Sequence, residues 1–275
     1  MKTFLRWNGN KSVHLKHIIP FLPEKFNTYI EPFIGSGAVF LFLQPAKWII
    51  SDINKDLINI WNTVLDDPKY IVSSYKKFGK KFIPLSNDDK LLLCRATTSR
   101  IDPMSYDRKR AVSYLLMIHC VYQNTLTVHN KFYFNGIHPH IYVRDKYYFL
   151  TDRYYENIRE VSSYLHRSRG RILNKDYKEV LKKAKEGDFV FLDPPYIEDH
   201  EYGFNYNKDE VLDKDFMNNL LKAVIDLDKK NVKWLMTQAD TPAIRSLFRG
   251  FKVSSFHVYR SGSHIFKKEL IIRNY

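Results

Sequence analysis

Short runs of β-branched and aromatic residues alternate with amphipathic stretches along most of the chain. Between most of these runs the apolar residues return at helical spacing, as Phe216, Leu220, Val224 and Leu227 do within residues 215–228. An alternation of strands and helices predicts an α/β fold with a parallel sheet and right-handed crossovers. The predicted strands are residues 28–33, 47–51, 171–174, 189–192, 232–236, 252–259 and 269–274.

The connection between the last two predicted strands departs from this alternation. Residues 260–268 are too short and too polar to form a crossover helix. We therefore expect the carboxy-terminal strands to form an antiparallel hairpin at the edge of the sheet.

A longer departure lies between the second and third predicted strands. Residues 57–145 read as mainly helical and end in a hairpin that turns at Asn135-Gly136. This segment predicts an inserted domain at residues 57–145, while residues 1–56 and 146–275 form the domain that contains the sheet. The clearest elements of the insertion are helices at 90–100 and 109–122 and hairpin arms at 131–134 and 141–143.

Charge changes this picture by indicating a partner. The 275 residues include 44 Lys and Arg against 30 Asp and Glu, which gives a formal net charge of +14. An excess of this size favours a polyanion, of which nucleic acid is the commonest, although a solvated basic surface accounts for the charge equally well.

Cysteine usage and hydropathy indicate the compartment. Cys94 and Cys120 are the only cysteines and show no C-x-x-C spacing, so a disulfide framework and a structural zinc site are both disfavoured. The first thirty residues lack the pattern of a signal peptide, and the longest apolar stretch, residues 38–43, is far too short to span a bilayer. We expect a cytoplasmic protein that does not enter a membrane.

Two motifs point to a bound nucleoside. Glu31-Pro32-Phe33-Ile34-Gly35-Ser36-Gly37 follows the first predicted strand and opens a helix at Ala38, where glycines let the backbone approach a ligand closely. Phe40 stands where a dinucleotide fingerprint needs a third glycine, which argues against a pyrophosphate site. Asp52 ends the second strand, where its carboxylate can accept hydrogen bonds from both hydroxyls of a ribose. The alternative for Asp52 is to cap the helix that begins at residue 55.

The third motif is Asp193-Pro194-Pro195-Tyr196, directly after the apolar strand at residues 189–192. Two prolines stiffen this loop and remove its N–H donors, so the loop presents mainly acceptors. An exocyclic amine carries two N–H donors, which the Asp193 carboxylate and the Pro194 carbonyl can accept, while Tyr196 stacks on the base. The tetrapeptide therefore indicates chemistry on an amine.

In their order along the chain these motifs resemble the Dam-like DNA adenine-N6 methyltransferases. Trp7, Gly9 and Lys11 match the family's amino-terminal W-x-G-x-K motif, and Asp176-Tyr177 matches the pair that borders the cofactor adenine. Residues 237–240 and 269–275 also match family signatures. The resemblance covers nearly the whole chain and implies a Rossmann-like, S-adenosylmethionine-dependent methyltransferase fold, with residues 57–145 as the DNA target-recognition domain.

The resemblance also implies roles for individual residues, with S-adenosylmethionine as the cofactor and no metal. The cofactor-binding residues would be Trp7, Lys11, Glu31, Phe33, Gly35, Gly37, Asp52, Ile53, Asp176, Tyr177 and Asp193. The catalytic residues would be Asp193, Pro194 and Tyr196. The DNA-binding residues would be Asn124, Leu126, Val128 and Lys131, together with Phe204 and Tyr206 in the aromatic loop after the tetrapeptide.

The chain departs from the family pattern at two places. Asn8 and Asn10 flank a single Gly9 where the family often has adjacent glycines, although Trp7 and Lys11 keep their spacing. At the position of Val128, GATC-specific relatives carry an arginine, which can read guanine through a bidentate contact. GATC specificity is therefore not transferred to this chain.

We predict an enzyme that transfers a methyl group from S-adenosylmethionine to an adenine flipped out of a short palindromic site in double-stranded DNA. It would act as a monomer or a weak dimer on DNA, with a cognate restriction endonuclease as a candidate partner. Methylation of RNA adenine or of cytosine-N4 stays open, because related tetrapeptides occur in other amine methyltransferases. A catalytically silent DNA-binding relative also stays open, although Asp52, Asp193 and Tyr196 disfavour it.

Overall fold

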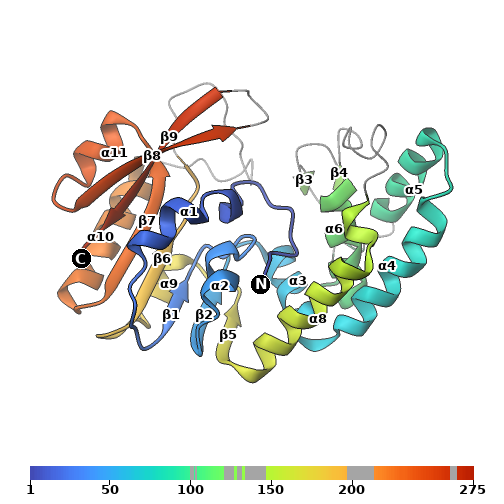
Figure 1. The fold of residues 1–275 in the computed structure, drawn as a ribbon, viewed down its shortest axis with the longest axis horizontal. Helices are drawn as coiled ribbons and strands as arrows, with labels where there is room; N and C mark the ends of the chain where they lie inside the picture. Colours follow the sequence, from blue (N-terminus) through green and yellow to red (C-terminus); the bar gives the residue numbers. More distant parts are fainter. Residues whose placement is uncertain are drawn as a thin grey trace. The chain divides into compact units, whose positions relative to one another are not determined.

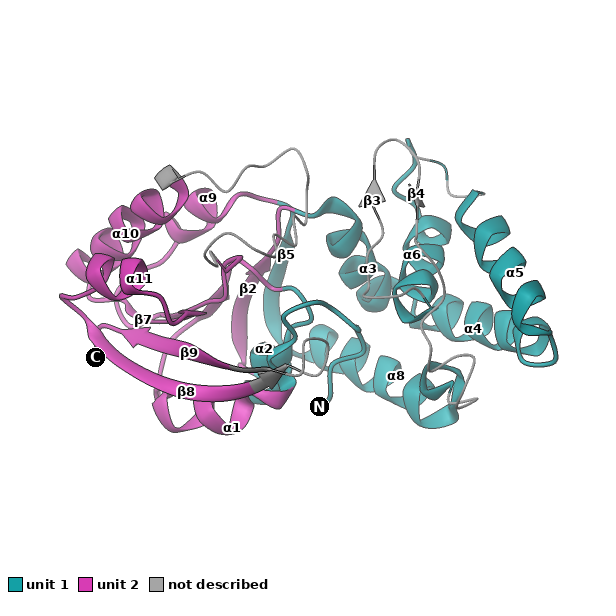
Figure 2. Ribbon diagram, turned by 90° about the horizontal axis from the view of Figure 1, so that it is seen from above, with its two compact units in different colours: residues 1–12, 35–44, 54–174 teal, residues 13–34, 45–53, 175–275 magenta. Residues whose placement is uncertain are grey.

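The computed structural model describes residues 1–99, 102, 104–120, 127–128, 132–133, 147–196, 214–260 and 265–275. The chain divides into two compact units, which Figure 2 draws in different colours. The helical unit consists of residues 1–12, 35–44 and 54–174, and the sheet unit consists of residues 13–34, 45–53 and 175–275.

The sheet unit holds six strands of the seven-stranded sheet, in the order β2-β1-β6-β7-β9-β8. β2, β1, β6 and β7 run parallel to one another, whereas β9 runs antiparallel to both β7 and β8. All four residues of β6 are buried, which explains its unbroken apolar sequence. The bounds are β1 Tyr29–Glu31, β2 Lys47–Ser51, β6 Phe189–Leu192, β7 Lys233–Ala239, β8 Lys252–Arg260 and β9 Ile265–Arg273.

Helices cover both faces of this sheet (Figures 1 and 2). α9, α10 and α11 lie on one side and α1 lies on the other. α10 packs on β7 through the apolar stripe expected from the sequence, since Leu220, Val224 and Leu227 are buried. The bounds are α1 Leu15–Ile18, α9 Tyr177–Leu181, α10 Lys214–Lys229 and α11 Pro242–Leu247, with 3₁₀ turns at Lys11–Val13 and Ile19–Phe21.

The helical unit is built on longer helices whose first turns are capped by side chains. Asn54 accepts a hydrogen bond from the Leu57 N–H at the start of α3, and Asp67 and Thr151 cap α4 and α8 in the same way. The described helices of this unit are α2 Ala38–Leu43, α3 Lys55–Asp66, α4 Pro68–Phe82, α5 Asn87–Ser99, α6 Arg108–Cys120 and α8 Asp152–Arg167, with a 3₁₀ turn at Tyr148–Leu150. Its described strands are β3 Thr127–Val128, β4 Phe132–Tyr133 and β5 Arg169–Leu173.

The core of the helical unit is aromatic. Trp61 of α3 is fully buried and packs edge-on against Phe4, with ring centroids 4.8 Å apart, and against Phe40 of α2 at 6.1 Å. Phe4 lies three residues before Trp7, so this packing anchors the amino-terminal segment that carries the W-x-G-x-K motif.

The predicted α/β sheet and its carboxy-terminal antiparallel hairpin are confirmed. In the inserted segment, β4 at Phe132–Tyr133 pairs with β3 at Thr127–Val128, a strand that the sequence did not predict. The expected partner at 141–143 and the Asn135-Gly136 turn lie outside the described residues. The assignment of residues 57–145 as a DNA-recognition domain stays a prediction. No helix within the described part of the chain is long and apolar enough to cross a membrane.

Candidate functional site

The carboxyl ends of the parallel strands carry three of the predicted acidic residues. Glu31 ends β1 and pairs with Ile50, so Asp52 follows two residues further along the direction of β2. β6 is the neighbour of β1 on the other side and is followed at once by Asp193. Because the carboxyl ends of parallel strands meet at one edge of a sheet, all three carboxylates belong to that edge of the sheet unit.

Backbone and hydroxyl hydrogen bonds tie the loops at this edge together. The Ile34 N–H donates to the Ser51 carbonyl at 2.9 Å, and the Ser51 hydroxyl donates to the Lys175 carbonyl at 3.0 Å. The Lys175 N–H donates back to the Ser51 hydroxyl at 3.3 Å. The last two hydrogen bonds join Ser51 to Lys175. Asp52 and Asp176 each follow one of these two residues, so the same contacts fix the backbone next to both carboxylates.

The two acidic residues, Asp52 and Asp176, have different surroundings. Asp176 caps α9 by accepting a hydrogen bond from the Lys178 N–H at 2.8 Å. Asp52 is half-buried directly after β2. The alternative role of Asp52 as a helix cap is wrong, because Asn54 supplies the cap of α3. Ile53, between Asp52 and Asn54, is exposed, with 52% of its surface accessible.

Three aromatic side chains cluster beside these loops. Phe33 stacks on Tyr177 with ring centroids 5.4 Å apart, and Phe216 of α10 packs edge-on against Tyr177 at 5.5 Å. The Tyr177 hydroxyl is buried and has no hydrogen-bond partner among the described residues. Burial, followed by the nearby Asp176 carboxylate, raises the pKa of Tyr177 to about 12, so its hydroxyl stays a donor at neutral pH.

The Asp193-Pro194-Pro195-Tyr196 loop is held by side chains from the neighbouring strands. The Thr237 hydroxyl of β7 donates to Asp193 Oδ1 at 2.7 Å, and the Gln238 amide donates to the Pro195 carbonyl at 3.4 Å. From β9, Glu269 Oε2 accepts a hydrogen bond from the Tyr196 hydroxyl at 2.9 Å. Three of the four loop residues are thus fixed by contacts with β7 and β9.

Electrostatics keep Tyr196 protonated in this setting. Burial of the hydroxyl, then the charges of Asp193 and Glu269, raise the pKa of Tyr196 well above its ordinary value. Glu269 also lies within 3.1 Å of His14 Nδ1, and only 2% of the Glu269 side chain is exposed. The buried Glu269 carboxylate therefore lies within hydrogen-bonding distance of both the Tyr196 hydroxyl and the His14 ring.

Four predicted cofactor residues lie in the helical unit. Gly35 has φ +44°, and a Cβ there would lie 3.1 Å from Trp7 Cδ1, so only glycine lets the loop pass this close to the indole. Gly37, with φ +65°, is the residue from which α2 starts. Lys11 is 5% exposed and donates through Nζ to the Gly9 carbonyl at 3.1 Å.

The predicted cofactor-binding and catalytic residues are divided between the two units. The sheet unit contains Glu31, Phe33, Asp52, Ile53, Asp176, Tyr177, Asp193, Pro194 and Tyr196, and the helical unit contains Trp7, Lys11, Gly35 and Gly37. Val128 belongs to β3, whose side chains lie outside the description. The other predicted DNA-binding residues lie outside the described residues: Asn124, Leu126, Lys131, Phe204 and Tyr206.

Sequence reasoning did not assign Thr237, Gln238, Glu269 or His14 to the site. The first three lie in segments that match family signatures, and that match was their only signal. His14 lay between the amino-terminal motif and the first helix without any signal. Each was missed because its contact partner is distant in sequence, 44 residues for Thr237 and 255 for His14.

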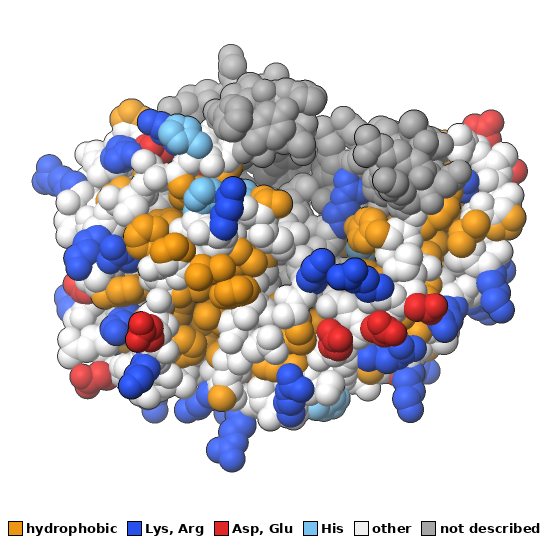
Figure 3. Space-filling model, viewed as in Figure 1, with side chains coloured by type: hydrophobic (Ala, Val, Ile, Leu, Met, Phe, Trp, Pro, Cys, Tyr) orange, Lys and Arg blue, Asp and Glu red, His pale blue; other side chains and the backbone are white. Residues whose placement is uncertain are grey.

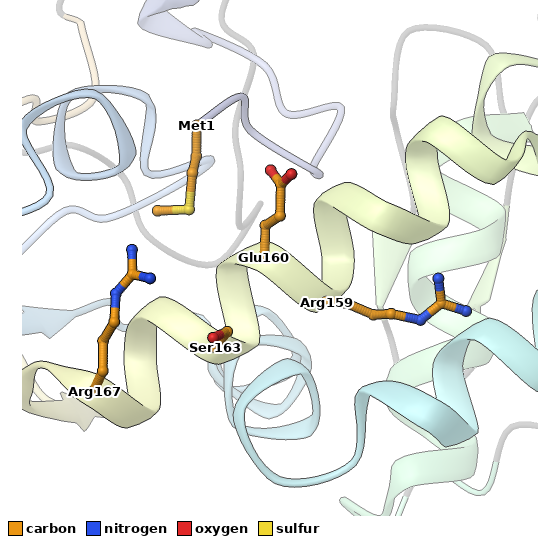
Figure 4. Close-up of a pocket in the computed structure, with 5 residues that line it drawn as sticks. All are labelled: Met1, Arg159, Glu160, Ser163 and Arg167. Carbon is orange, nitrogen blue, oxygen red and sulfur yellow. The ribbon is translucent and has the colours of Figure 1, made fainter.

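One cavity lies apart from these residues. A cavity of about 500 Å³ opens beside α8 and is lined by Met1, Arg159, Glu160, Ser163 and Arg167 (Figure 4). None of the predicted site residues lines this cavity. Within the described part of the chain, no three His, Cys, Asp or Glu side chains group in a way that could hold a metal ion.

The chain is similar to known proteins in sequence. A family model described as D12 class N6 adenine-specific DNA methyltransferase matches residues 7–261. The type II methyltransferase M1.LlaDCHI of Lactococcus lactis subsp. cremoris is 30% identical over 295 residues, which cover 100% of this chain and 96% of that protein. The DNA adenine methylase of Haemophilus influenzae is 24% identical over 286 residues, covering 99% and 91%. Among solved structures, an rRNA methyltransferase from Streptomyces viridochromogenes aligns at a TM-score of 0.38 and 12% identity over 94% of this chain and 81% of that one, a likeness too distant to argue from.

Proposed function

Since this chain belongs to the D12 class of N6 adenine-specific DNA methyltransferases, we propose that it takes its methyl group from S-adenosylmethionine and delivers it to an adenine flipped out of double-stranded DNA. It is a DNA adenine methyltransferase by family. The observation that carries the proposed mechanism is the acceptor loop at residues 193–196, which β7 and β9 hold in place.

The residues present suit S-adenosylmethionine as the donor. The donor carries a positive charge and an adenosine, and the strand edge offers carboxylates for a cation and for ribose hydroxyls. The Phe33 and Tyr177 rings offer a flat apolar surface for an adenine, and the buried Tyr177 hydroxyl lacks a partner among the described residues. Asp52 would hold the ribose, and Trp7 and Lys11 would hold the rest of the donor. When bound, the donor would supply a methyl group carried on a sulfonium sulfur, and the sulfur–carbon bond would break as the nitrogen–carbon bond to the amine forms.

The acceptor loop would orient the adenine amine. Its two N–H groups would donate to the Asp193 carboxylate and the Pro194 carbonyl, which turns the nitrogen lone pair away from the loop. The Thr237 hydroxyl on Oδ1 fixes the rotation of the Asp193 carboxylate. Asp193 can take up the proton that the amine loses after methylation, and Tyr196 stacks on the base. The chain would contribute orientation and charge placement.

Contacts to DNA are proposed from charge and from the inserted segment. The net charge of +14 suits phosphate binding, although basic and acidic side chains are interspersed on the face drawn in Figure 3. We place target recognition in residues 57–145, with Asn124, Leu126, Val128 and Lys131 reading the site and Phe204 and Tyr206 holding the flipped base. We propose a short palindromic site, and GATC specificity is not transferred because Val128 stands where GATC-specific relatives carry an arginine.

The cellular setting is proposed from the relatives. Type II methyltransferases such as the Lactococcus lactis relative take their name from restriction systems, which supports a cognate restriction endonuclease as a partner. We propose a cytoplasmic enzyme that acts on DNA as a monomer or weak dimer.

One experiment tests the acceptor and the site together. Unmethylated DNA is treated with the purified protein and S-adenosylmethionine and then sequenced by a method that detects N6-methyladenine, with RNA and cytosine-rich DNA as parallel acceptors. We expect methyladenine at one short motif in double-stranded DNA. Transfer to RNA or to cytosine would replace the adenine-in-DNA proposal, and binding without transfer would support a silent relative.

Asp52→Asn is expected to weaken donor binding. The amide keeps the shape of the side chain but replaces one charged acceptor with an N–H donor, and losing a hydrogen bond to a charged group weakens affinity by roughly 10–100-fold. Calorimetric titration with S-adenosylmethionine measures the effect. Asp226→Asn, on the exposed face of α10, is the control and should leave the affinity unchanged. Equal affinity in Asp52→Asn and wild type would remove the ribose role.

Gly35→Ala is expected to disturb the indole of Trp7. The new Cβ would lie 3.1 Å from Trp7 Cδ1, and the positive φ costs an L-residue about 1–2 kcal/mol. Because Trp7 must shift, we expect donor affinity to fall by about tenfold, with a smaller change in thermal stability. Gly250→Ala is the control for the glycine-to-alanine change itself, since a Cβ there meets nothing within 4 Å and the φ of Gly250 is not positive. Tryptophan fluorescence during titration reports both the indole environment and the affinity.

A further inference from the structure

We propose that His14 and Glu269 are positioning residues that hold the Tyr196 ring against the target base. The inference rests on the proposed role of Tyr196 in stacking on adenine. His14, Glu269 and Tyr196 all belong to the sheet unit, and their contacts form one chain of hydrogen bonds.

The centre of this chain is Glu269 in β9. Glu269 pairs with Ala239 of β7 on one side and with Phe256 of β8 on the other, so its backbone is held within the sheet. Its Oε2 atom is 2.9 Å from the Tyr196 hydroxyl and 3.1 Å from His14 Nδ1. Since 2% of the side chain is exposed, these hydrogen bonds replace solvation that a buried carboxylate needs.

The direction of each hydrogen bond follows from the chemistry of the groups. An ionised carboxylate only accepts hydrogen bonds, so both the Tyr196 hydroxyl and His14 Nδ1 must carry the hydrogen. The raised pKa of Tyr196 keeps its phenol protonated, so this hydroxyl serves as an anchor rather than as a base. Hydrogen bonds that involve a charged partner are about twice as strong as neutral ones, which suits a role in orientation.

His14 is itself held in place from β8. The Phe256 ring, whose residue pairs with Glu269 across the strands, packs edge-on against the His14 ring at 6.0 Å and stacks on His17 at 4.8 Å. His14 is 11% exposed, so it is nearly enclosed. It also lies three residues after Lys11, so one short segment carries both the proposed donor-binding lysine and the anchor for Tyr196.

The physical consequence concerns orientation of the base. A tyrosine without a hydroxyl partner can move the end of its side chain, whereas a hydrogen bond at the hydroxyl fixes where that end lies. Because a phenol O–H prefers the plane of its ring, a fixed acceptor also favours one ring plane. A base stacked on that ring takes its own orientation from it, and misplacement at a reacting centre lowers the rate more than it lowers affinity. Glu269 and His14 would therefore act on the methyl-transfer rate and would leave donor affinity unchanged.

A double-mutant cycle on the full chain tests the proposal. Tyr196→Phe removes only the hydroxyl, and Glu269→Met removes the acceptor while nearly keeping the volume. Each single variant is expected to lower the single-turnover rate of methyl transfer by about tenfold, from loss of one hydrogen bond to a charged group. The double variant should fall by about the same tenfold, because both substitutions break the same contact. S-adenosylmethionine affinity should match wild type in all three.

Conservative variants supply a second readout. Glu269→Gln keeps an oxygen that accepts from Tyr196, and His14→Gln keeps an N–H that donates to Glu269. Both should recover most of the rate that Glu269→Met and His14→Phe lose. Glu156→Met on α8 and His257→Gln on β8, both exposed, are controls for the same kinds of substitution. Thermal melting shows which variants are folded, and Tyr196→Phe, which removes one atom, serves if Glu269→Met does not fold.

The outcomes separate this inference from the proposed function. If the two single effects multiply to about a hundredfold, or if donor affinity falls together with the rate, the positioning role is overturned while the methyltransferase assignment stands. An unchanged rate in Tyr196→Phe overturns it as well. If the wild-type chain transfers no methyl group to DNA adenine, the proposed function fails and this inference fails with it.

Discussion

Replacement of Asp193 with alanine is expected to lower the rate of methyl transfer by on the order of 10³-fold or more, from loss of a preorganised group at the reacting centre. The carboxylate is the charged acceptor of the loop, and alanine removes both of its oxygens. The substitution also leaves the Thr237 hydroxyl without the Asp193 oxygen to which it donates at 2.7 Å. DNA association should persist, because a carboxylate does not attract a phosphate and its removal costs no such contact.

A tritium-transfer assay with labelled S-adenosylmethionine measures this effect, and a gel-shift titration measures DNA association in parallel. The control is Asp226→Ala, which removes an exposed carboxylate from α10 and should keep wild-type turnover. Turnover within tenfold of wild type in Asp193→Ala would remove the acceptor role. A loss of DNA association equal to the loss of turnover would show that Asp193 contributes to DNA binding and not to methyl transfer.

Asp56→Ala is expected to give the largest loss of stability among the substitutions considered. Arg110 of α6 binds Asp56 of α3 through two hydrogen bonds of 2.5 and 2.9 Å, and the two side chains are 2% and 8% exposed. Removing one partner of a buried ion pair leaves an uncompensated charge and costs about 3–5 kcal/mol. Arg110 keeps its donation to the Asp102 carbonyl at 2.7 Å, which does not neutralise its charge.

Thermal and urea unfolding measure this loss. A cost of about 3–5 kcal/mol lowers Tm by roughly 6–20 °C in a chain of this size. Asp66→Ala, at the exposed end of the same helix, is the control and should change stability by less than about 0.5 kcal/mol. Asp56→Leu combined with Arg110→Met should recover much of the loss, since it removes both charges. A Tm within 2 °C of wild type for Asp56→Ala would show that water or another group compensates Arg110.

Features encoded by neighbouring residues could be predicted without coordinates. β2 and β6 have the bounds expected from their apolar runs, at Lys47–Ser51 and Phe189–Leu192. The start of α2 after Gly37 follows from the local conformational freedom of glycine. The placement of Glu31, Asp52 and Asp193 at one sheet edge then follows from parallel strands, because their carboxyl ends coincide.

Short strands in the inserted segment could not be paired in the same way. Phe132–Tyr133 forms a strand as expected, and its pairing with Thr127–Val128 was not predicted. Two-residue strands carry too little alternation of apolar and polar side chains to specify a register or a partner. The cap of α3 shows the same limit, since Asp52 and Asn54 are both suitable residues and geometry selects Asn54.

The reactive tetrapeptide and the class of chemistry could be predicted from the sequence itself, because an acceptor-rich loop needs only four consecutive residues. The side chains that hold this loop could not be predicted. They are Thr237, Gln238 and Glu269, which lie 44, 43 and 73 residues away from their partners. These contacts exist because folding sets β6 beside β7 and β7 beside β9, an order that depends on long-range packing. His14 reaches Glu269 across 255 residues for the same reason, and no local pattern encodes such a contact.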